Sequence, residues 1–546
     1  MAEITSMIQG KYHVCHRIVS SCKSAGEQLL ARKPMSDIQI EIETENDMRR
    51  TLGWVQLTGI GLGCVIGIGI FTFSGQAAAR YAGPAVIISF LLAGIVALLA
   101  ALSFSEMAAM MSSSGSAYTY AYAALGEYWA WIVACNLAIM YELAASTVVM
   151  GWSKYVVHLV NIAFNRNVSS VVFDSTLMWT SGTVITLTGA ALDLPAIAIT
   201  VVITIILIVG IRQTATINLI LVFIKVIILL IFVFVCCRYI NVEHYQPFFP
   251  ENQGSFDSFG VSGVLKGATF VFLAYVGFES IGSIAQEAKK PTRTLPVSII
   301  GCTVFSMTIY VIVSSVMVGL VPYSLLDSQS PLSVAINTTP YGLWLSIIMD
   351  IGAIVSLATV ALTMLLAQTR IFYAMAHDRL LPPIFARIYS NTKTPWISIL
   401  ISGTICALIS GVCPIDILGE TTSISALIVY FFVHISVIVM RYTHKNMPRS
   451  FRVPFGAWPI PTIGAALCVA FLINTSKGAA IRLAISIGIG NIIYFSYAFW
   501  HSDRRKILKR DVSTTSMSEF ISTIEIHSGS FTNIDAEGSS VDETAV

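Results

Sequence analysis

The sequence predicts an all-α integral membrane protein of about twelve transmembrane helices, arranged as an inverted five-plus-five repeat with two peripheral helices. The first supporting observation is composition: 55% of the 546 residues are hydrophobic, 11% are charged, and the mean hydropathy is +0.77. A soluble domain is nearer about 25% charged. The second is a pair of glycine-rich interruptions, near 61–71 and 274–280, at corresponding places in two halves of the chain. The third is the concentration of basic residues in alternate loops.

The apolar segments set the number of spans, because crossing the hydrocarbon core takes about 20 mostly apolar residues. We expect spans near 54–76, 83–107, 126–153, 191–210, 214–238, 263–286, 296–320, 343–376, 395–413, 419–441, 459–475 and 479–500. The stretch 171–190 is semi-apolar but contains Asp174 and several hydroxyl residues, which indicates an extramembrane loop. The ten cysteines show no spacing typical of a metal site or a disulfide framework.

The chain divides into a cytosolic N-terminal tail (1–53), a transmembrane domain (54–500) and a disordered cytosolic C-terminal tail (501–546). No signal-peptide pattern precedes the first span, and residues 36–50 could form a short amphipathic helix. The C-terminal tail begins basic, which favours anionic lipid, and then becomes rich in Ser, Thr and acidic residues. Its last residues, 543–546, match a weak motif for capture by a PDZ domain.

The loop charges indicate the orientation. With the N-terminus in the cytosol, most basic loop residues fall inside, as the positive-inside rule requires, so both termini are expected in the cytosol. Glycosylation motifs at Asn167 and Asn337 then lie on the outer side, and a third at Asn474 lies close to the membrane.

The two interruptions are the candidate substrate site. A helix that unwinds within a bilayer leaves backbone groups that lipid cannot satisfy, so a break persists only in protein or beside a watery cavity. A break at Gly67–Gly69 exposes N–H groups suited to a carboxylate, and one at 274–277 exposes carbonyls suited to an ammonium group. Together they fit the zwitterion of an α-amino acid. Alternatively, the glycines simply allow close helix packing.

Several motifs resemble the amino acid–polyamine–organocation superfamily, and most closely its cationic amino acid transporter branch. They are Gly-Ile-Gly-Ile-Phe at 67–71, Ala-Gly-Pro-Ala at 82–85, Ser-Glu-Met at 105–107, Gly-Ser-Ala-Tyr at 115–118, Ala-Tyr-Val-Gly-Phe-Glu at 274–279, Gln-Thr-Arg-Ile-Phe-Tyr-Ala-Met at 368–375 and Arg-Val-Pro-Phe at 452–455. The resemblance implies a leucine-transporter-like fold and alternating access around a midplane site. The substrate-binding set is then Ile66, Gly67, Ile68, Gly69, Phe272, Ala274, Tyr275, Gly277 and Phe278.

Lys225 lies in the middle of the fifth expected span, where a charged side chain is costly. In sodium-independent relatives a lysine at this place fills the space of a sodium ion, so the match implies no sodium requirement and makes Lys225 a candidate proton carrier. The alternative is a structural cation bonded to backbone carbonyls. Ser356 and Thr359 in the eighth span are its expected neighbours, although a threonine on an apolar helix often bonds its own backbone.

Buried acids need separate interpretation. Glu279 follows the second break and could face the site or cap the half-helix that begins there. Many relatives carry a glutamate where this chain has Met140, and Glu142 lies two residues on, about 200° around the helix. Glu142 is therefore not expected to replace it, which leaves selectivity for cationic substrates in doubt.

These observations predict a secondary transporter of amino acids that works by alternating access, with Lys, Arg and ornithine favoured by the resemblance. A neutral amino acid or polyamine carrier, or an amino acid sensor that retains the fold, remain alternatives. The plasma membrane is favoured over a vacuolar or lysosomal one. No enzyme motif, metal or cofactor is expected. The expected partners are the amino acid, lipid and, as a candidate, a proton; nucleic acid is not one.

Overall fold

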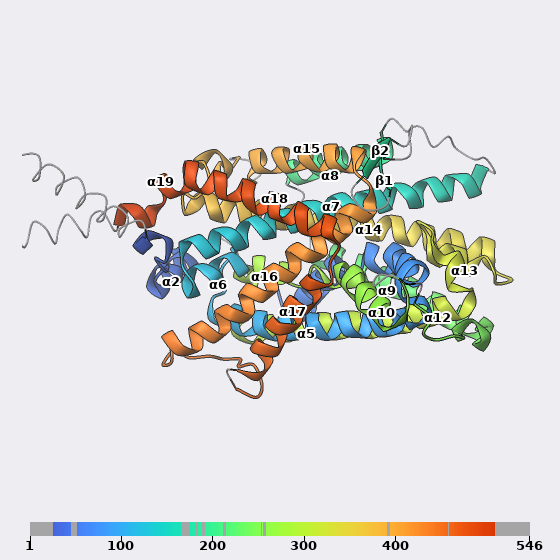
Figure 1. Cartoon of the computed structure of the whole chain (residues 1–546). Helices are drawn as coiled ribbons and strands as arrows, with labels where there is room; N and C mark the ends of the chain where they lie inside the picture. Colours follow the sequence, from blue (N-terminus) through green and yellow to red (C-terminus); the bar gives the residue numbers. More distant parts are fainter. Residues whose placement is uncertain are drawn as a thin grey trace, which may run out of the picture.

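The computed structural model shows an elongated bundle of helices (Figure 1). It describes residues 26–44, 52–164, 175–180, 184–187, 192–210, 215–252, 254, 258–389, 394–456 and 458–507. Asn167, the tail beyond 507 and its PDZ-type motif lie outside the described residues. Figure 1 shows the first described helix, α2 (Met35–Thr44), and the last, α19 (Phe499–His501), at the same end of the bundle. We call this end the terminal face and the other end the opposite face.

Eight helices are long and apolar enough to cross a membrane, and four shorter apolar helices accompany them among the described residues. The first span is broken into α3 (Trp54–Val65) and the turns from Gly69 to Ala82, and the sixth is broken in the same way. The other spans are α5 (Val86–Met110), α7 (Glu127–Phe164), α8 (Leu194–Val209), α9 (Ala215–Cys236), α12 (Pro291–Leu320), α14 (Gly342–His377), α15 (Trp396–Val412), α16 (Ile415–Thr443), α17 (Pro459–Ile473) and α18 (Lys477–Ile493). The prediction of about twelve spans is confirmed.

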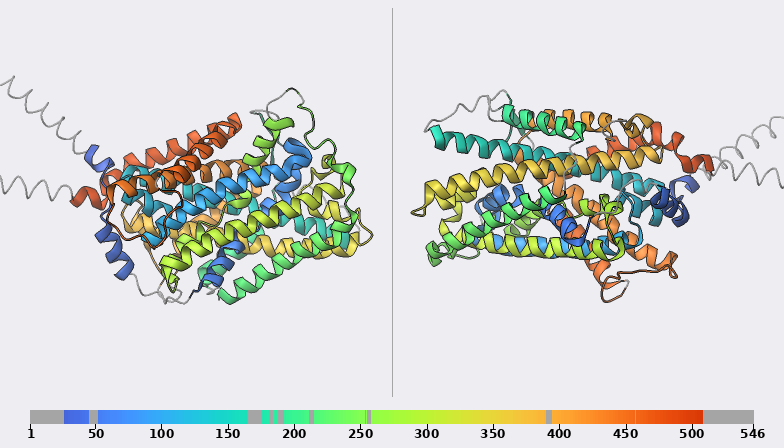
Figure 2. Two further views of the ribbon diagram at one scale, coloured as in Figure 1. Left: turned by 90° about the horizontal axis from the view of Figure 1, so that it is seen from below. Right: turned by 180° about the vertical axis from the view of Figure 1, so that it is seen from behind.

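The packing of the spans follows the order of the two halves. Each of the first four spans packs against the span five places later: the broken helices meet one another, α5 meets α12, α7 meets α14, and α8 meets α15. Figure 2 shows the long helices running side by side between the two ends of the bundle. This pairing is what an inverted five-plus-five repeat predicts, because helices related by the pseudo-two-fold axis lie across it from one another.

Local sequence explains where several helices begin and end. Gly83 has φ +61°, a left-handed conformation that glycine adopts freely, and Pro84 then starts the turn into α5. Asp193 caps α8 by accepting a hydrogen bond from the Ala196 N–H at 3.2 Å. Gly210, at φ +70°, ends the same helix.

Two elements lie outside the spans. The strands β1 (Leu177–Thr180) and β2 (Val184–Leu187) form an antiparallel hairpin, within the stretch expected to be an extramembrane loop. Helix α2 overlaps the expected amphipathic segment 36–50. It packs against the bundle, since its Ile38 is fully buried.

A buried ion pair holds the end of α5 to α16. Glu106, which is 1% exposed, accepts hydrogen bonds from Arg441 Nε at 2.8 Å and from the Val453 N–H at 2.8 Å. Arg441 Nη2 bonds the second carboxylate oxygen. This supports the structural interpretation of Glu106 because the carboxylate is already satisfied by groups from distant parts of the chain.

Replacing Glu106 with glutamine should therefore lower stability. Removing one partner of a buried pair leaves the other charge uncompensated and costs about 3 kcal/mol. We expect a lower midpoint of thermal unfolding for the purified Glu106→Gln variant in detergent. Glu251→Gln, at an exposed position, is the control and should match the parent protein; equal midpoints for all three proteins would contradict the assignment.

Candidate functional site

The first break separates α3 from a short π-helical turn, η1 (Gly69–Phe73). Ile66 leaves the helix with an extended backbone, φ −73° and ψ 96°. The chain resumes helical hydrogen bonds at Ile70 and Phe71, whose N–H groups both donate to the Gly67 carbonyl. The N–H groups of Gly67, Ile68 and Gly69 belong to the first turn of a new helix and so lack intrahelical acceptors. They provide the donor-rich end that the sequence predicted.

The second break follows α10 (Gly260–Val271) and a 3₁₀ turn, η7 (Phe272–Tyr275). Val276 is extended, and Gly277 has φ +132°, which side-chain-bearing residues rarely adopt. The helix resumes in α11 (Ser280–Ser283). Backbone groups at the break are satisfied locally: the Gly277 N–H donates to Glu279 Oε2 at 2.9 Å, and the Ser280 hydroxyl donates to the Gly277 carbonyl at 2.5 Å.

The two breaks lie against each other. A Cβ added to Gly69 would lie 2.2 Å from the Ala274 Cβ, and one added to Gly277 would lie 3.0 Å from the Cys64 carbonyl carbon. No larger residue fits at Gly69 without moving the backbone of the partner break. The donor end of one break and the acceptor end of the other therefore share one buried place in the bundle.

Four carbonyls next to the first break are capped by side chains from four other helices. Each donor is buried and reaches across from a helix that encloses the break. The pairs are Lys225 Nζ to Gly63 O at 2.9 Å, Tyr310 Oη to Val65 O at 2.8 Å, Ser356 Oγ to Ile66 O at 3.1 Å and Tyr155 Oη to Phe71 O at 2.6 Å. Sequence analysis identified Lys225 and Ser356 but missed both tyrosines. A tyrosine within an apolar span must place its hydroxyl on a partner, and this signal could have found them.

The structure thus brings Lys225 to the first break, in contact with the backbone. Its ammonium group is 1% exposed and bonded to the Gly63 carbonyl. This contact fits the structural-cation interpretation and also puts a titratable group on the helix that carries the site, so the coupling role stays a prediction.

Other predicted residues have mixed placements. Ile68 packs against Gly151 of α7, and Gly67 faces Val360 of α14. The Thr359 hydroxyl donates to the Ser356 carbonyl of its own helix at 2.7 Å, and no hydrogen bond joins it to the break among the described residues. The Tyr275 hydroxyl points away to the Phe90 carbonyl of α5 at 2.8 Å, which leaves its backbone at the break.

Aromatic rings surround the second break. The Phe278 ring lies 5.2 Å from that of Tyr430 and 5.6 Å from that of Phe104, and Phe272 lies 5.7 Å from Tyr430. Tyr430 also donates to Glu279 Oε2 at 2.9 Å. Glu279 Oε1 is buried without a hydrogen-bond partner among the described residues. Glu279 therefore both holds the second half-helix and keeps one oxygen available within the bundle.

The opposite face is closed above the site. Arg80, at the end of the first span, pairs with Asp327 at 2.8 Å and with Asp416 of α16 at 2.7 Å. Below this pair, the rings of Phe73 and Phe270 lie 4.8 Å apart. Nearby, α13 (Pro331–Ile336) carries Asn337 at its end, and Asn337 is exposed. Its glycosylation stays a prediction.

The terminal face is closed below the site. Arg370 of α14 donates to the Ser283 carbonyl at 3.0 Å and to Glu287 at 3.1 Å, so that it holds the end of the sixth span. The backbone of Leu52 bonds that of Glu287 and Lys289. Ion pairs and backbone hydrogen bonds thus hold the ends of both broken spans.

Residues 26–44 add a second layer at the terminal face. Lys33 pairs with Glu41 at 2.5 Å and with Asp378 at 2.7 Å, and Asp378 also accepts from Tyr118. Burial lowers the pKa of Lys33, but the two carboxylates raise it more, and the pKa lies above its ordinary value. The cation therefore stays charged at physiological pH. We call residues 26–44 the N-terminal clasp.

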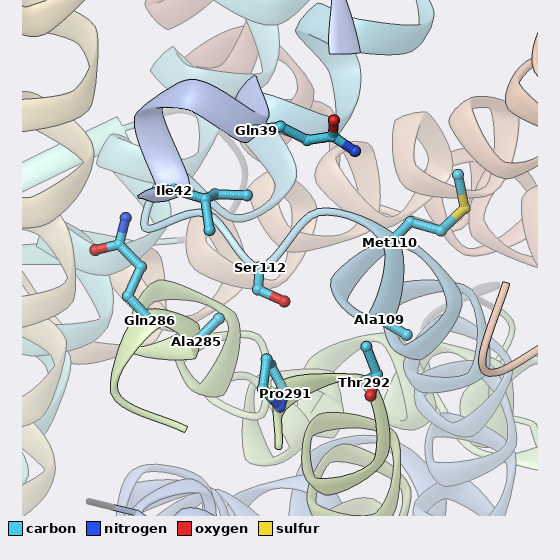
Figure 3. Close-up of a pocket in the computed structure, with 9 residues that line it drawn as sticks. All are labelled: Gln39, Ile42, Ala109, Met110, Ser112, Ala285, Gln286, Pro291 and Thr292. Atoms are coloured by element: carbon cyan, nitrogen blue, oxygen red, sulfur yellow. The ribbon is translucent and has the colours of Figure 1, made fainter. Parts of the chain in front are cut away.

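A cavity of about 190 Å³ lies between this clasp and the bundle (Figure 3). Gln39 and Ile42 of α2 form one wall, and Met110, Ser112 and Gln286 contribute to the others. The cavity shows that the clasp covers, rather than fills, the terminal end of the spans.

Comparison with known proteins gives a family match over most of the chain. Residues 52–497 match the family described as amino acid permease. This range contains both breaks, Lys225 and all the capping side chains.

Individual relatives fall into two groups. The chain is 34% identical to the methylthioribose transporter of Bacillus subtilis and 33% identical to its branched-chain amino acid permease BcaP, over 87% and 86% of the chain and 98% of each relative. It is 32% identical to cationic amino acid transporter 4 of Mus musculus, over 77% of the chain and 64% of that relative.

The contact between the breaks predicts the effect of adding a single methyl group at Gly69. Gly69→Ala forces two backbones apart, so uptake of a labelled amino acid into proteoliposomes should fall roughly tenfold or more. Gly301→Ala is the matched control, since a Cβ there meets nothing within 4 Å. Normal uptake by Gly69→Ala would show that the breaks are not held in this contact.

The N-terminal clasp predicts a change in access to the site. Lys33→Met removes the cation that joins two carboxylates, so the terminal face should open more often. Buried Cys64, which lies between the breaks, should then react faster with a hydrophilic maleimide, as followed by mass spectrometry of its peptide. Lys289→Met, at an exposed position, serves as control; an unchanged labelling rate in Lys33→Met would refute a gating role.

Proposed function

Because the chain belongs to the amino acid permease family, we propose that it is a sodium-independent secondary transporter of α-amino acids with neutral side chains. Family membership and the transporter relatives make it a multi-pass membrane transporter of amino acids and not an enzyme. The relatives also place it in the superfamily and branch that its motifs resemble. The choice of side chain, the coupling ion and the membrane are the proposed parts.

The observation that carries the proposal is the contact between the two breaks. Free N–H groups at Gly67–Gly69 bind the substrate carboxylate, and carbonyls at the end of η7 bind the ammonium group. Only a solute with both groups close together, as in an α-amino acid, uses both ends. Backbone atoms serve this purpose for any side chain, so selectivity depends on the residues around the breaks.

Those surrounding side chains support a neutral substrate. Val360 lies against Gly67, and the Met364 sulfur lies 3.6 Å from Cys64 Sγ. Met140 is fully buried at the position where the family resemblance implies a glutamate. The two relatives covered over 98% of their length are named for branched-chain amino acids and methylthioribose, and neither solute carries a charged side group.

A cationic substrate is the second candidate, as the sequence motifs predicted. Glu279 Oε1 is buried and unpartnered among the described residues, beside the rings of Phe278 and Tyr430. A carboxylate with aromatic neighbours can hold an ammonium or guanidinium group. Several relatives are named cationic amino acid transporters.

Transport then requires the two closed ends to open in turn. Opening the opposite face breaks the pairs of Arg80, and opening the terminal face breaks those of Arg370 and Lys33. The positive-inside distribution of basic residues supports a cytosolic location of the terminal face, and the plasma membrane is the location that we propose. Lys225 contacts the helix that must move, and we assign it the coupling role.

Uptake of labelled leucine and arginine into proteoliposomes tests the substrate. Competitors are the other amino acid, alanine and putrescine, with and without an inward proton gradient, in sodium-free buffer. We expect leucine uptake that alanine inhibits and arginine does not. Arginine uptake blocked by lysine would support the cationic candidate, putrescine uptake a polyamine carrier, and binding without flux a sensor.

Lys225 variants test coupling. Lys225→Met keeps the apolar stem but removes the donor to Gly63, so proton-stimulated uptake should be lost while the folded yield stays close to that of the parent. Lys225→Ala should behave likewise. Full uptake with unchanged pH dependence in both variants would exclude Lys225 as the coupling group. Lys266→Met is the control for the loss of any buried positive charge, because Lys266 pairs with Glu420 in the opposite half of the bundle.

A further inference from the structure

A second buried acid lies apart from the two breaks, where α7 packs against α14 and α15. Glu142 of α7 is 5% exposed. The Gln368 amide of α14 and the Cys406 thiol of α15 lie beside its carboxyl group. Ser146, one turn along α7, lies 3.4 Å from Cys406 Sγ of α15, so α7 and α15 are in contact here.

Unsatisfied oxygen atoms gather at this interface. Both carboxyl oxygens of Glu142, Oε1 of Gln368 and Oγ of Ser402 are buried and make no hydrogen bond of normal geometry within the described residues. Ser402 precedes Cys406 by one turn of α15, so both lie on one face of that helix. The interiors of native proteins rarely leave buried polar groups without hydrogen bonds. Three side chains with unpaired oxygen atoms on adjoining helices therefore indicate a bound species.

Among the described residues, no positively charged side chain pairs with the Glu142 carboxylate. The ion pairs among these residues do not include Glu142, and the side chains that α14 and α15 place beside it, Gln368 and Cys406, are neutral. Charged groups on the other helices that pack on α7 are engaged elsewhere: Asp416 with Arg80, Glu420 with Lys266 and Arg482, and Arg441 with Glu106, while His434 contacts Ser103.

An unpaired carboxylate at such a place costs several kcal/mol. The cost is removed when the group binds a cation or a proton. Four oxygens are fewer than a sodium ion ordinarily needs from hard oxygen ligands, whereas a proton needs one oxygen to bind and one to accept its hydrogen bond. Glu142 and Gln368 supply both.

We propose that Glu142 is a proton-binding site, separate from the substrate site. A hydronium ion transfers its proton to a Glu142 carboxylate oxygen and leaves as water, and the new O–H group donates to Gln368 Oε1. Release is the reverse transfer to water. Gln368 lies on α14, and α14 also carries Ser356, which caps the Ile66 carbonyl. Protonation of Glu142 therefore changes a contact of the same helix that caps the first break.

Infrared difference spectroscopy on the purified full-length protein tests this directly. Raising the pH should remove a carboxylic acid C=O band that is absent in Glu142→Gln and shifted in Glu142→Asp. Ser146→Ala, on the same helix, is the matched control and should keep the band, because the Ser146 hydroxyl bonds the Glu142 backbone carbonyl and not its carboxyl group. A band common to all variants would overturn the proposal, and loss of the band on adding sodium at constant pH would replace the proton with a metal cation.

Transport measurements give a second readout, which rests on the proposed function. Glu142→Gln should retain exchange of labelled leucine across the membrane but lose accumulation driven by a proton gradient. Accumulation equal to that of the parent would overturn a coupling role for the site. A parent protein that transports no leucine would refute the proposed substrate and leave the infrared result to stand or fall alone.

Discussion

The structure depends on one constraint: a helix broken inside a membrane must find partners for its freed backbone groups within the protein. Around the first break, Lys225, Tyr310, Ser356 and Tyr155 meet this need for four carbonyls. The N–H groups at the other side of the break are left for a ligand. Capping thus separates the acceptors, which the protein satisfies, from the donors, which the substrate satisfies in the proposed function. The break is stable only while the enclosing helices α7, α9, α12 and α14 stay in place.

The same arrangement explains how movement could be coupled to binding. Closure at the opposite face rests on Arg80, and closure at the terminal face rests on Arg370 and the N-terminal clasp. These ion pairs lie near the bundle ends, where water can replace a lost partner at modest cost. The caps at the midplane have no such replacement. A transporter built this way exchanges its end contacts while it keeps its central ones.

Sequence alone predicted the spans, both breaks, and the contact of Lys225 with the first break, because glycine in an apolar helix and charge within a membrane each have few physical explanations. Ser356 is expected from sequence only as a neighbour of Lys225, and its bond to the Ile66 carbonyl is seen only in the structure. It could not place Tyr310, Tyr155 or Tyr430, since the partner of a tyrosine hydroxyl depends on which helices meet. Thr359 bonds its own helix, as an apolar environment favours. The clasp joins residues 26–44 to Asp378, and such a long-range pairing leaves no local pattern.

The central claim is that backbone groups of two broken helices recognise both charges of an amino acid. Inhibition of labelled leucine uptake by three analogues tests it most directly: leucine itself, leucinamide, which lacks the carboxylate, and 4-methylpentanoate, which lacks the amine. The account predicts that unlabelled leucine competes and that neither analogue does at the same concentration. Competition by either analogue as strong as that by leucine would mean that one break, or neither, contributes to recognition.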